Sequence, residues 1–184
     1  MFGLITKLLK HGNHNQKDHA GKRGSGKESG DKFTTRVESE DKYTNRFYVE
    51  KNGKQIGEIH FYPETNNQMH IDFMGIDKSE RGAGRSVQML LAFSEMISKK
   101  YPSVDTFSAD LVWIGSYKAM RRAFGQPESI GDDIRNYSEQ EVEDYLPKGQ
   151  VESEDGTIDA ERHLSANFKK PRKLRSAVAS KIFG

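Results

Sequence analysis

The sequence of 184 residues contains no cysteine and no long hydrophobic run. The absence of cysteine excludes disulfides, thiol nucleophiles and thiolate metal ligands. No segment approaches the roughly 20 consecutive apolar residues that a membrane-spanning helix needs, and residues 1–9 are too short and lack the cleavage pattern of a secretory signal. We therefore expect a cytoplasmic protein with no membrane partner, in which any nucleophile or base is His, Asp, Glu, Ser, Tyr, Lys or water.

Charges are segregated along the chain, although the formal net charge is only +2. The two ends are basic, whereas residues 128–161 are dominated by carboxylates. Such blocks are typical of tails that contact something other than their own core. We expect three regions: a flexible, basic, His- and Gly-rich arm at 1–32 with a short amphipathic start, a folded core at 33–125, and an acidic helix and loop followed by a basic tail at 126–184.

The N-terminal arm cannot fold alone, because residues 11–32 contain no hydrophobic side chain larger than that of Ala20. His11, His14 and His19 are spaced closely enough to bind zinc together with Asp18. A solvated polar arm is the alternative that we favour, and no metal site is predicted.

The C-terminal basic residues favour no single partner. They could follow the phosphates of a nucleic acid or line an acidic protein groove, and a solubilising tail or one folded back on the acidic segment fits equally well. No interleaved aromatic residues support single-strand binding. The residues are Lys169, Lys170, Arg172, Lys173 and Arg175.

Hydrophobic periodicity predicts an antiparallel meander followed by alternating helices and strands. Alternating residues predict strands at 33–38, 46–50, 55–62 and 69–73, with an Asn-Gly turn before the third strand. Helical spacing follows at 86–99, then a strand at 106–113, a helix at 116–124 that ends at Gly125, and a short capped acidic helix at 138–146. This order predicts an α+β fold with a mixed, mostly antiparallel, twisted sheet flanked by helices and extended tails.

The segment from Ile76 to Ser86 (IDKSERGAGRS) lies between a predicted strand and a predicted helix. Backbone N–H groups at a helix start are unpaired, and together with the helix dipole they attract anions. Gly82 and Gly84 permit positive φ and let a phosphate approach the chain. An ordinary strand-to-helix turn without a ligand is the alternative.

The pattern Arg81-Gly-x-Gly-x-Ser86, entered from a strand with Ile76 five residues before the Arg, resembles the pyrophosphate-binding motif of the GNAT N-acetyltransferases. That family usually has Gly or Ala where this chain has Ser86. The resemblance covers roughly residues 46–125 and implies a GNAT-like core and an acetyl-CoA-dependent N-acetyltransferase acting on an unidentified amine. Lys78 and Arg85 would neutralise phosphate charge. The implied acetyl-CoA contacts are Met74, Gly75, Ile76, Arg81, Gly82, Ala83, Gly84, Arg85, Ser86 and Ser116.

Acetyl transfer to an amine needs a base for the ammonium and an acid for the departing thiolate. Glu58, His70 and Asp72 are the candidate bases, and Glu58 and Asp72 are our choice; each can equally be a solvated residue of the sheet face. Tyr117 is the candidate acid, although it lies a turn or more before the position of the family's Tyr. The resemblance also implies that N–H groups near Met74–Ile76 polarise the thioester carbonyl.

The segment from Lys10 to Gly24 (KHGNHNQKDHAGKRG) resembles a short segment of tailed-phage head-associated proteins. This implies a phage or prophage origin, with other phage structural proteins as partners of the two tails. The family's usual pair of helices between its first two strands is also missing. The alternative function is therefore a non-catalytic virion protein built on a GNAT-like scaffold, located in the particle rather than in the host cytoplasm.

Overall fold

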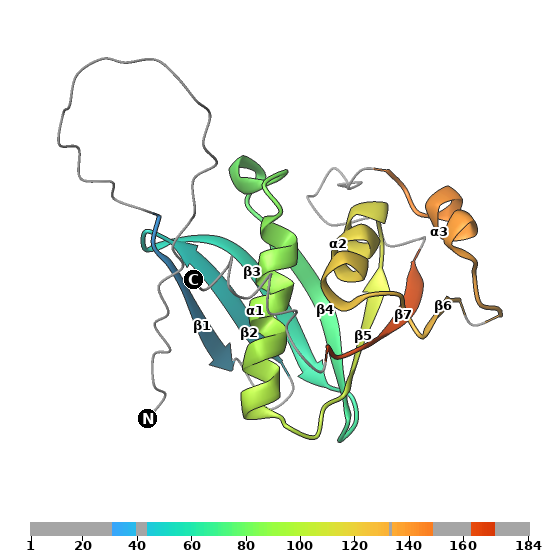
Figure 1. Ribbon diagram of the computed structural model, residues 1–184, viewed down its shortest axis with the longest axis horizontal. Helices are drawn as coiled ribbons and strands as arrows, with labels where there is room; N and C mark the ends of the chain where they lie inside the picture. Colours follow the sequence, from blue (N-terminus) through green and yellow to red (C-terminus); the bar gives the residue numbers. More distant parts are fainter. Residues whose placement is uncertain (1–30, 40–43, 133, 149–162, 172–184) are drawn as a thin grey trace, which may run out of the picture.

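The computed structural model describes residues 31–39, 44–132, 134–148 and 163–171. These residues form one seven-stranded sheet with the strand order β1-β2-β3-β4-β5-β7-β6 (Figure 1). The elements are β1 (Phe33–Ser39), β2 (Asn45–Lys51), β3 (Lys54–Pro63), β4 (Gln68–Ile76), the 3-10 helix η1 (Lys78–Glu80), α1 (Arg85–Lys100), β5 (Thr106–Leu111), α2 (Ile114–Phe124), β6 (Ser129–Gly131), α3 (Glu139–Tyr145) and β7 (Leu164–Lys169).

Among the described strands, β4 and β5 form the one parallel pair, and every other neighbouring pair is antiparallel. The predicted α+β class with a mixed, mostly antiparallel sheet is therefore confirmed. The predicted Asn-Gly turn joins β2 to β3, where Asn52 and Gly53 adopt φ values of 54° and 82°. Positive φ at both positions is the geometry of a tight hairpin turn.

Helices α1 and α2 lie on the same face of the sheet (Figure 1). Phe93 of α1 is fully buried, and its ring lies 5.0 Å from that of Phe61 in β3 and 5.6 Å from that of Phe107 in β5. The ring of Phe124, at the end of α2, lies 4.8 Å from that of Phe107 and 6.1 Å from that of Phe168 in β7. These contacts join both helices and three strands into one apolar core, which we call the covered face.

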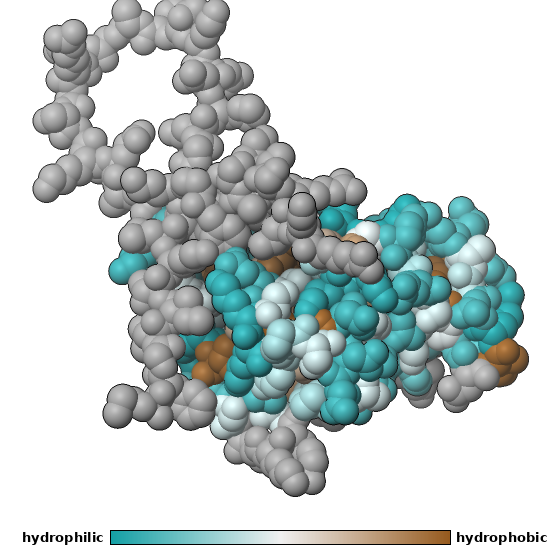
Figure 2. Space-filling model, turned by 60° about the horizontal axis from the view of Figure 1, so that its bottom comes forward, coloured by the Kyte–Doolittle hydropathy of each residue, from teal (hydrophilic) through white to brown (hydrophobic). Residues whose placement is uncertain are grey.

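Residues that alternate with this core form the opposite face, where the described residues place no helix. We call it the open face. Because neighbouring side chains of a strand point to opposite sides, the polar residues of β3, β4, β5 and β7 gather there. Seen from below the view of Figure 1, much of the described surface is also hydrophilic (Figure 2). The residues of the open face include Glu58, His60, Tyr62, His70, Ser108, Asp110, Ser165 and Asn167.

The sheet continues beyond Gly125, where the sequence pattern indicated the end of the core. β7 pairs with β5 over its whole length and with β6 on its other side. Phe168, expected to begin the basic tail, is fully buried together with Leu164 and Ala166. Three alternating apolar residues next to a basic run are too short a signal to predict this strand. The expected arm at 1–30 and the basic residues from 172 onward lie outside the described residues.

Gly57 in β3 brings α1 close to the sheet. A Cβ at this position would lie 2.5 Å from Cδ1 of Ile76 and 3.0 Å from the sulfur of Met89 in α1. Contacts of that length do not occur without displacement, so the absence of a side chain sets the distance between the start of α1 and the ends of β3 and β4.

Candidate functional site

β4 and β5 pair only part of the way along β4. Their parallel ladder runs from Gln68↔Thr106 to Ile71↔Ala109, and β4 then continues to Ile76. In the part of the chain that the structure describes, no strand pairs with the β5-facing edge of residues 72–76. The two strands therefore diverge from an apex at Ile71 and Ala109, and we call the space between them the cleft.

Main-chain groups of β4 face this cleft. The N–H of Asp77 donates to the carbonyl of Ile56 in β3 at 2.8 Å, and backbone groups of an antiparallel strand alternate between its two edges. The N–H and C=O of Met74 and Ile76 therefore point away from β3, into the cleft. Arg81 Nε donates to the Ile76 carbonyl at 3.1 Å, which places the Arg81 side chain at the mouth of the cleft.

The glycine turn follows β4 and leads into α1. Gly82 and Gly84 have φ values of 84° and 72°, and α1 has no side-chain cap at its N-terminus. Four backbone N–H groups of this turn donate to no described residue, and a Cβ on either glycine meets no described atom within 4 Å. The turn is thus an open cluster of donors at the positive end of a helix dipole. The four donors are those of Gly82, Ala83, Gly84 and Ser86.

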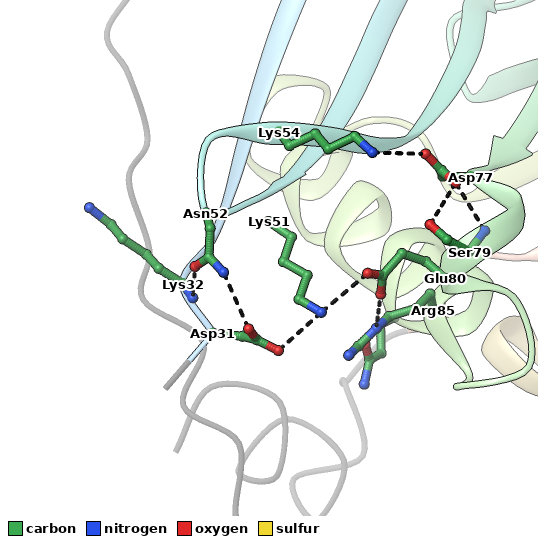
Figure 3. Close-up of polar contacts among 10 residues, drawn as sticks. Asp31, Lys32, Lys51, Asn52, Lys54, Asp77, Ser79, Glu80 and Arg85 are labelled. Carbon is green, nitrogen blue, oxygen red and sulfur yellow. Dashed lines mark hydrogen bonds and ion pairs between the residues drawn. The ribbon is translucent and has the colours of Figure 1, made fainter. Parts of the chain in front are cut away.

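Ion pairs from the β2–β3 hairpin hold the turn in place (Figure 3). Glu80 lies between Lys51 Nζ at 3.1 Å and Arg85 Nε at 3.4 Å, and Asp77 lies 3.6 Å from Lys54 Nζ. Asp77 also accepts hydrogen bonds from the N–H and the hydroxyl of Ser79, which lower the pKa of its carboxyl. The hydrogen bond to Asp31, followed by that to Glu80, raises the pKa of Lys51.

The side chain of Arg85, which the sequence pattern made a candidate phosphate contact, contacts residues of η1, α1 and β1. Its guanidinium contacts Glu80, donates to Gln88 at 2.8 Å and lies 4.8 Å from the centre of the Phe33 ring. Only 10% of the side chain is exposed. Lys78 is exposed on η1. Arg85 therefore holds the turn together, while Arg81 is the arginine that lies beside the cleft.

The predicted bases Glu58 and Asp72 both belong to the open face but lie at different distances from the apex. Glu58 is opposite Gly75, and its carboxylate accepts a hydrogen bond from Gln55 at 3.3 Å. Asp72 is exposed at the irregularity where β4 has one residue more than β3. Asp72 is the first residue beyond the apex, whereas Glu58 lies near the glycine-turn end of β4.

The structure also shows a polar network that sequence reasoning missed. His70 Nδ1 lies 3.0 Å from Ser108 Oγ, which donates to Glu64 at 2.6 Å. His70 Nε2 lies 4.0 Å from Asp110, whose other carboxylate oxygen accepts from Ser165 at 2.7 Å. Burial, and then the charges of Asp72, Glu64 and Asp110, raise the pKa of Tyr62, whose ring lies 4.8 Å from that of His70.

Tyr117, the candidate acid, is almost fully buried in α2, and burial raises the pKa of its phenol. It lines a shallow hollow with residues of β6 and of the segment that leads to α3, among them Ser129, Tyr137 and Glu139. The structure thus groups it with the β6–α3 region and not with the network around His70. Ser116 lies in the first turn of α2, where its N–H donates to the carbonyl of Trp113 at 3.1 Å.

No described helix is long and apolar enough to span a membrane. Within the described ranges, no group of three or more His, Asp and Glu side chains is arranged to hold a metal ion. His11, His14 and His19 lie outside these ranges.

No family model and no curated protein matches the sequence. Solved structures do match. One is a GNAT family acetyltransferase from Elizabethkingia anophelis with acetyl-CoA bound, which is 12% identical; the match covers 74% of this chain and 97% of that chain, with a TM-score of 0.50. The fold is GNAT-like. The ribosomal-protein-S18-alanine N-acetyltransferase from Escherichia coli matches at 10% identity over 74% of this chain and 75% of its own, with a TM-score of 0.48. An IAA acetyltransferase from Bacillus cereus matches at 15% identity over 69% and 78%, with a TM-score of 0.46.

The GNAT-like core predicted from the glycine turn is therefore confirmed as a fold. The connection between β1 and β2 is short, since β1 ends at Ser39 and β2 begins at Asn45. No pair of helices fits into that connection, as the sequence pattern predicted.

Proposed function

We propose that this protein is an acetyl-CoA-dependent N-acetyltransferase of the GNAT type. The observation that carries the proposal is the continuity of two sets of main-chain groups with which no described strand or helix pairs. The β5-facing edge of residues 72–76 runs directly into the open N–H cluster of the glycine turn. A ligand with an extended amide-containing arm and a diphosphate at one end matches both.

Acetyl-CoA has this shape. Its pyrophosphate would accept hydrogen bonds from the N–H groups of Gly82 to Ser86, with Arg81 beside it at the mouth of the cleft. Its pantetheine arm would follow Met74, Gly75 and Ile76 along the unpaired edge of β4. Residues 72 and 76 lie about 13 Å apart at about 3.3 Å per residue, so the arm would bring the acetyl group toward the apex.

The open face supports attack by an amine at that apex. Glu58, Glu64, Asp72 and Asp110 put four carboxylates on this side of β3, β4 and β5, which favours the approach of an ammonium group. The amine, once deprotonated, would attack the thioester carbonyl, and the cleft-facing N–H of Met74 or Ile76 would stabilise the negative oxygen. A base on the open face accepts the ammonium proton.

Calorimetric titration with acetyl-CoA tests the proposal. We expect micromolar binding by the wild-type protein and none by Gly84→Glu, because the carboxylate would occupy the phosphate position and repel it. Gly125→Glu is the matched control, since Gly125 also has positive φ, 98°, and open space at its Cβ, but lies at the end of α2. Absence of binding by a folded wild-type protein would contradict the proposal.

A non-catalytic scaffold is the second candidate, and the position of Tyr117 favours it. With the phenol buried beside β6 and α3, the proposed site lacks the acid that the GNAT resemblance implies. Phage origin and attachment to a virion rest on the sequence of the arm alone. Detection of the protein in purified phage particles, together with an absence of acetyl-CoA binding, would support this function.

A further inference from the structure

His70 occupies a special place on the open face. It is opposite Ser108 in the second-to-last pair of the β4–β5 ladder, one residue before the apex where the strands diverge. Its side chain is only 10% exposed and lies against the ring of Tyr62. A group at this position would meet an amine that approaches the apex from the open face.

The hydrogen bonds around Ser108 define where the ring proton of His70 lies. A carboxylate is ionised at neutral pH and only accepts hydrogen bonds, so at 2.6 Å from Glu64 the Ser108 hydroxyl proton points to Glu64. The same hydroxyl has no second proton. At 3.0 Å, the Ser108 oxygen must therefore accept a hydrogen bond from His70 Nδ1. The neutral ring then carries its proton on Nδ1 and a lone pair on Nε2.

Nε2 is the atom of His70 that remains available for chemistry. It has no hydrogen bond to a described residue, and it is not sealed from solvent. Asp110 lies 4.0 Å from Nε2 and Glu64 lies 3.9 Å from Nδ1, so a proton gained at Nε2 gives a positive ring between two carboxylates. The ring of Tyr62 also lies against the ring of His70, and the charge of Asp72, two residues along β4, acts on the Tyr62 phenol.

We infer that Glu64 and Ser108 fix the tautomer of His70 and that His70 Nε2 is the base of the acetyl-transfer site; this role rests on the proposed transferase function. Nε2 takes a proton from the acceptor ammonium, and the amine electron pair forms the new C–N bond to the acetyl carbon. The C–S bond breaks, and its electron pair leaves with the CoA sulfur. The second amine proton is released to the thiolate, which gives an amide and the CoA thiol, and Nε2 returns its proton to water.

Neither predicted base offers an equivalent arrangement. Glu58 lies opposite Gly75, beside the part of β4 that the CoA arm would follow, and its carboxylate accepts a hydrogen bond from the exposed side chain of Gln55. Asp72 lies close to the apex but has no hydrogen bond to a described residue that would orient it. Glu64 and Ser108 are positioning residues, because they act on the substrate only through His70.

Nitrogen-15 NMR of the histidine rings in the full chain tests the tautomer without acetyl-CoA. At a pH where imidazole is neutral, we expect the His70 shifts of a ring protonated on Nδ1. Ser108→Ala should give a mixture of the two tautomers, and Ser108→Thr, which keeps the hydroxyl, should restore the wild-type shifts. A wild-type ring protonated on Nε2, or a tautomer unchanged in Ser108→Ala, overturns the inference.

Turnover tests the role of Nε2. CoA thiol release would be followed with acetyl-CoA and a tryptic digest of serum albumin, which offers many α-amines and lysine side chains. We expect His70→Gln to lower kcat at least about 100-fold and Ser108→Ala to lower it about tenfold, with acetyl-CoA affinity unchanged in both. His60→Gln, on the neighbouring strand of the same face, is the control and should turn over like the wild type.

The possible failures are distinguishable. If wild type binds no acetyl-CoA while the proton is on Nδ1, the proposed function fails, and the role of Nε2 fails with it. If wild type binds and turns over acetyl-CoA but His70→Gln is equally active, the inference about His70 is wrong and the proposed function stands.

Discussion

The two faces of this sheet differ in what their residues do. On the covered face, aromatic residues of α1, α2 and three strands pack without polar partners, and Phe61, Phe93 and Phe107 are fully buried. On the open face, the neighbours of these residues along the same strands form hydrogen bonds and ion pairs at 2.6–4.0 Å. Adjacent residues of β5 show this difference: Phe107 packs in the core, and Ser108 belongs to the polar network of the open face. The covered face should therefore determine stability and the open face activity.

Phe93→Ala is the substitution with the largest expected effect. The Phe93 ring is completely buried between Phe47, Phe61 and Phe107, so its loss leaves a cavity and should lower the free energy of unfolding by about 3–5 kcal/mol. Urea unfolding monitored by circular dichroism measures the change. Asp72→Asn on the open face should change it by no more than about 0.5 kcal/mol. Comparable losses in the two variants would contradict the division between faces.

Phe168→Ala tests whether the covered face extends through β7. Phe168 is fully buried and contacts Phe124 at the end of α2. We expect a loss of about 3 kcal/mol, at the lower end for buried phenylalanine because β7 lies toward one side of the sheet. The neighbouring open-face variant Asn167→Ala is the comparison. If the free energy of unfolding of Phe168→Ala equals that of wild type, residues 164–169 do not contribute to the stability of the core.

Lys51→Ala tests the contribution of ion pairs at the glycine turn, which is held by charged side chains where the covered face is held by apolar packing. Removal of Lys51 leaves Glu80 with Arg85 alone near the open N–H cluster, and the less neutralised carboxylate should repel a diphosphate. Since partly exposed pairs contribute little, we expect acetyl-CoA affinity to fall only a few-fold, and less at high salt. Lys100→Ala, at the other end of α1, should leave the affinity unchanged. An effect insensitive to salt would argue against an electrostatic cause.

The smallest expected effect depends on pH and concerns α3. Hydrogen bonds from the N–H and hydroxyl of Ser138, and then from Arg135, lower the pKa of Glu141 from 4.5 to about 2. A lowered pKa in the folded state means that the charged form stabilises the fold. The advantage of wild type over Glu141→Gln should thus be complete at neutral pH, decline below pH 4.5 and disappear below about pH 2.

Urea midpoints measured across this pH range would show the predicted decline. A constant difference between wild type and Glu141→Gln would indicate that the capping box acts through packing instead of charge.

Local patterns predicted most of the fold, and long-range contacts account for what they missed. The strands before residue 76 and the three α-helices follow from alternation, helical spacing, the Asn-Gly turn and the capping box at Ser138, each of which lies within a few residues. β7 depends on pairing with β5 more than 50 residues away, since Ser165 is opposite Asp110. A six-residue strand with three apolar side chains does not reveal such a partner.

In the candidate site, too, local features could be predicted from the sequence and long-range contacts could not. The glycine turn was predicted because its glycines and the helix start are adjacent in sequence. The network of Glu64, His70 and Ser108 was not, because Ser108 lies 38 residues from His70 and 44 from Glu64. The role of Arg85 as a phosphate contact remains a prediction. Its contacts with Glu80 and Phe33 were not predicted, because these residues become neighbours only when the hairpin folds against the turn.

Gly57 links the geometry of the two strands to that of the glycine turn. It contacts no proposed ligand, yet a single methyl group there would press on Met89 of α1 and on Ile76 at the end of β4. An outward shift of α1 would also move the N–H groups at its N-terminus, while the edge of β4 would stay fixed in the sheet. The distance between the edge of β4 and the first N–H groups of α1, the two halves of the proposed binding surface, therefore depends on the absence of a side chain at Gly57. A substitution there should change acetyl-CoA affinity, although Gly57 does not contact the proposed ligand.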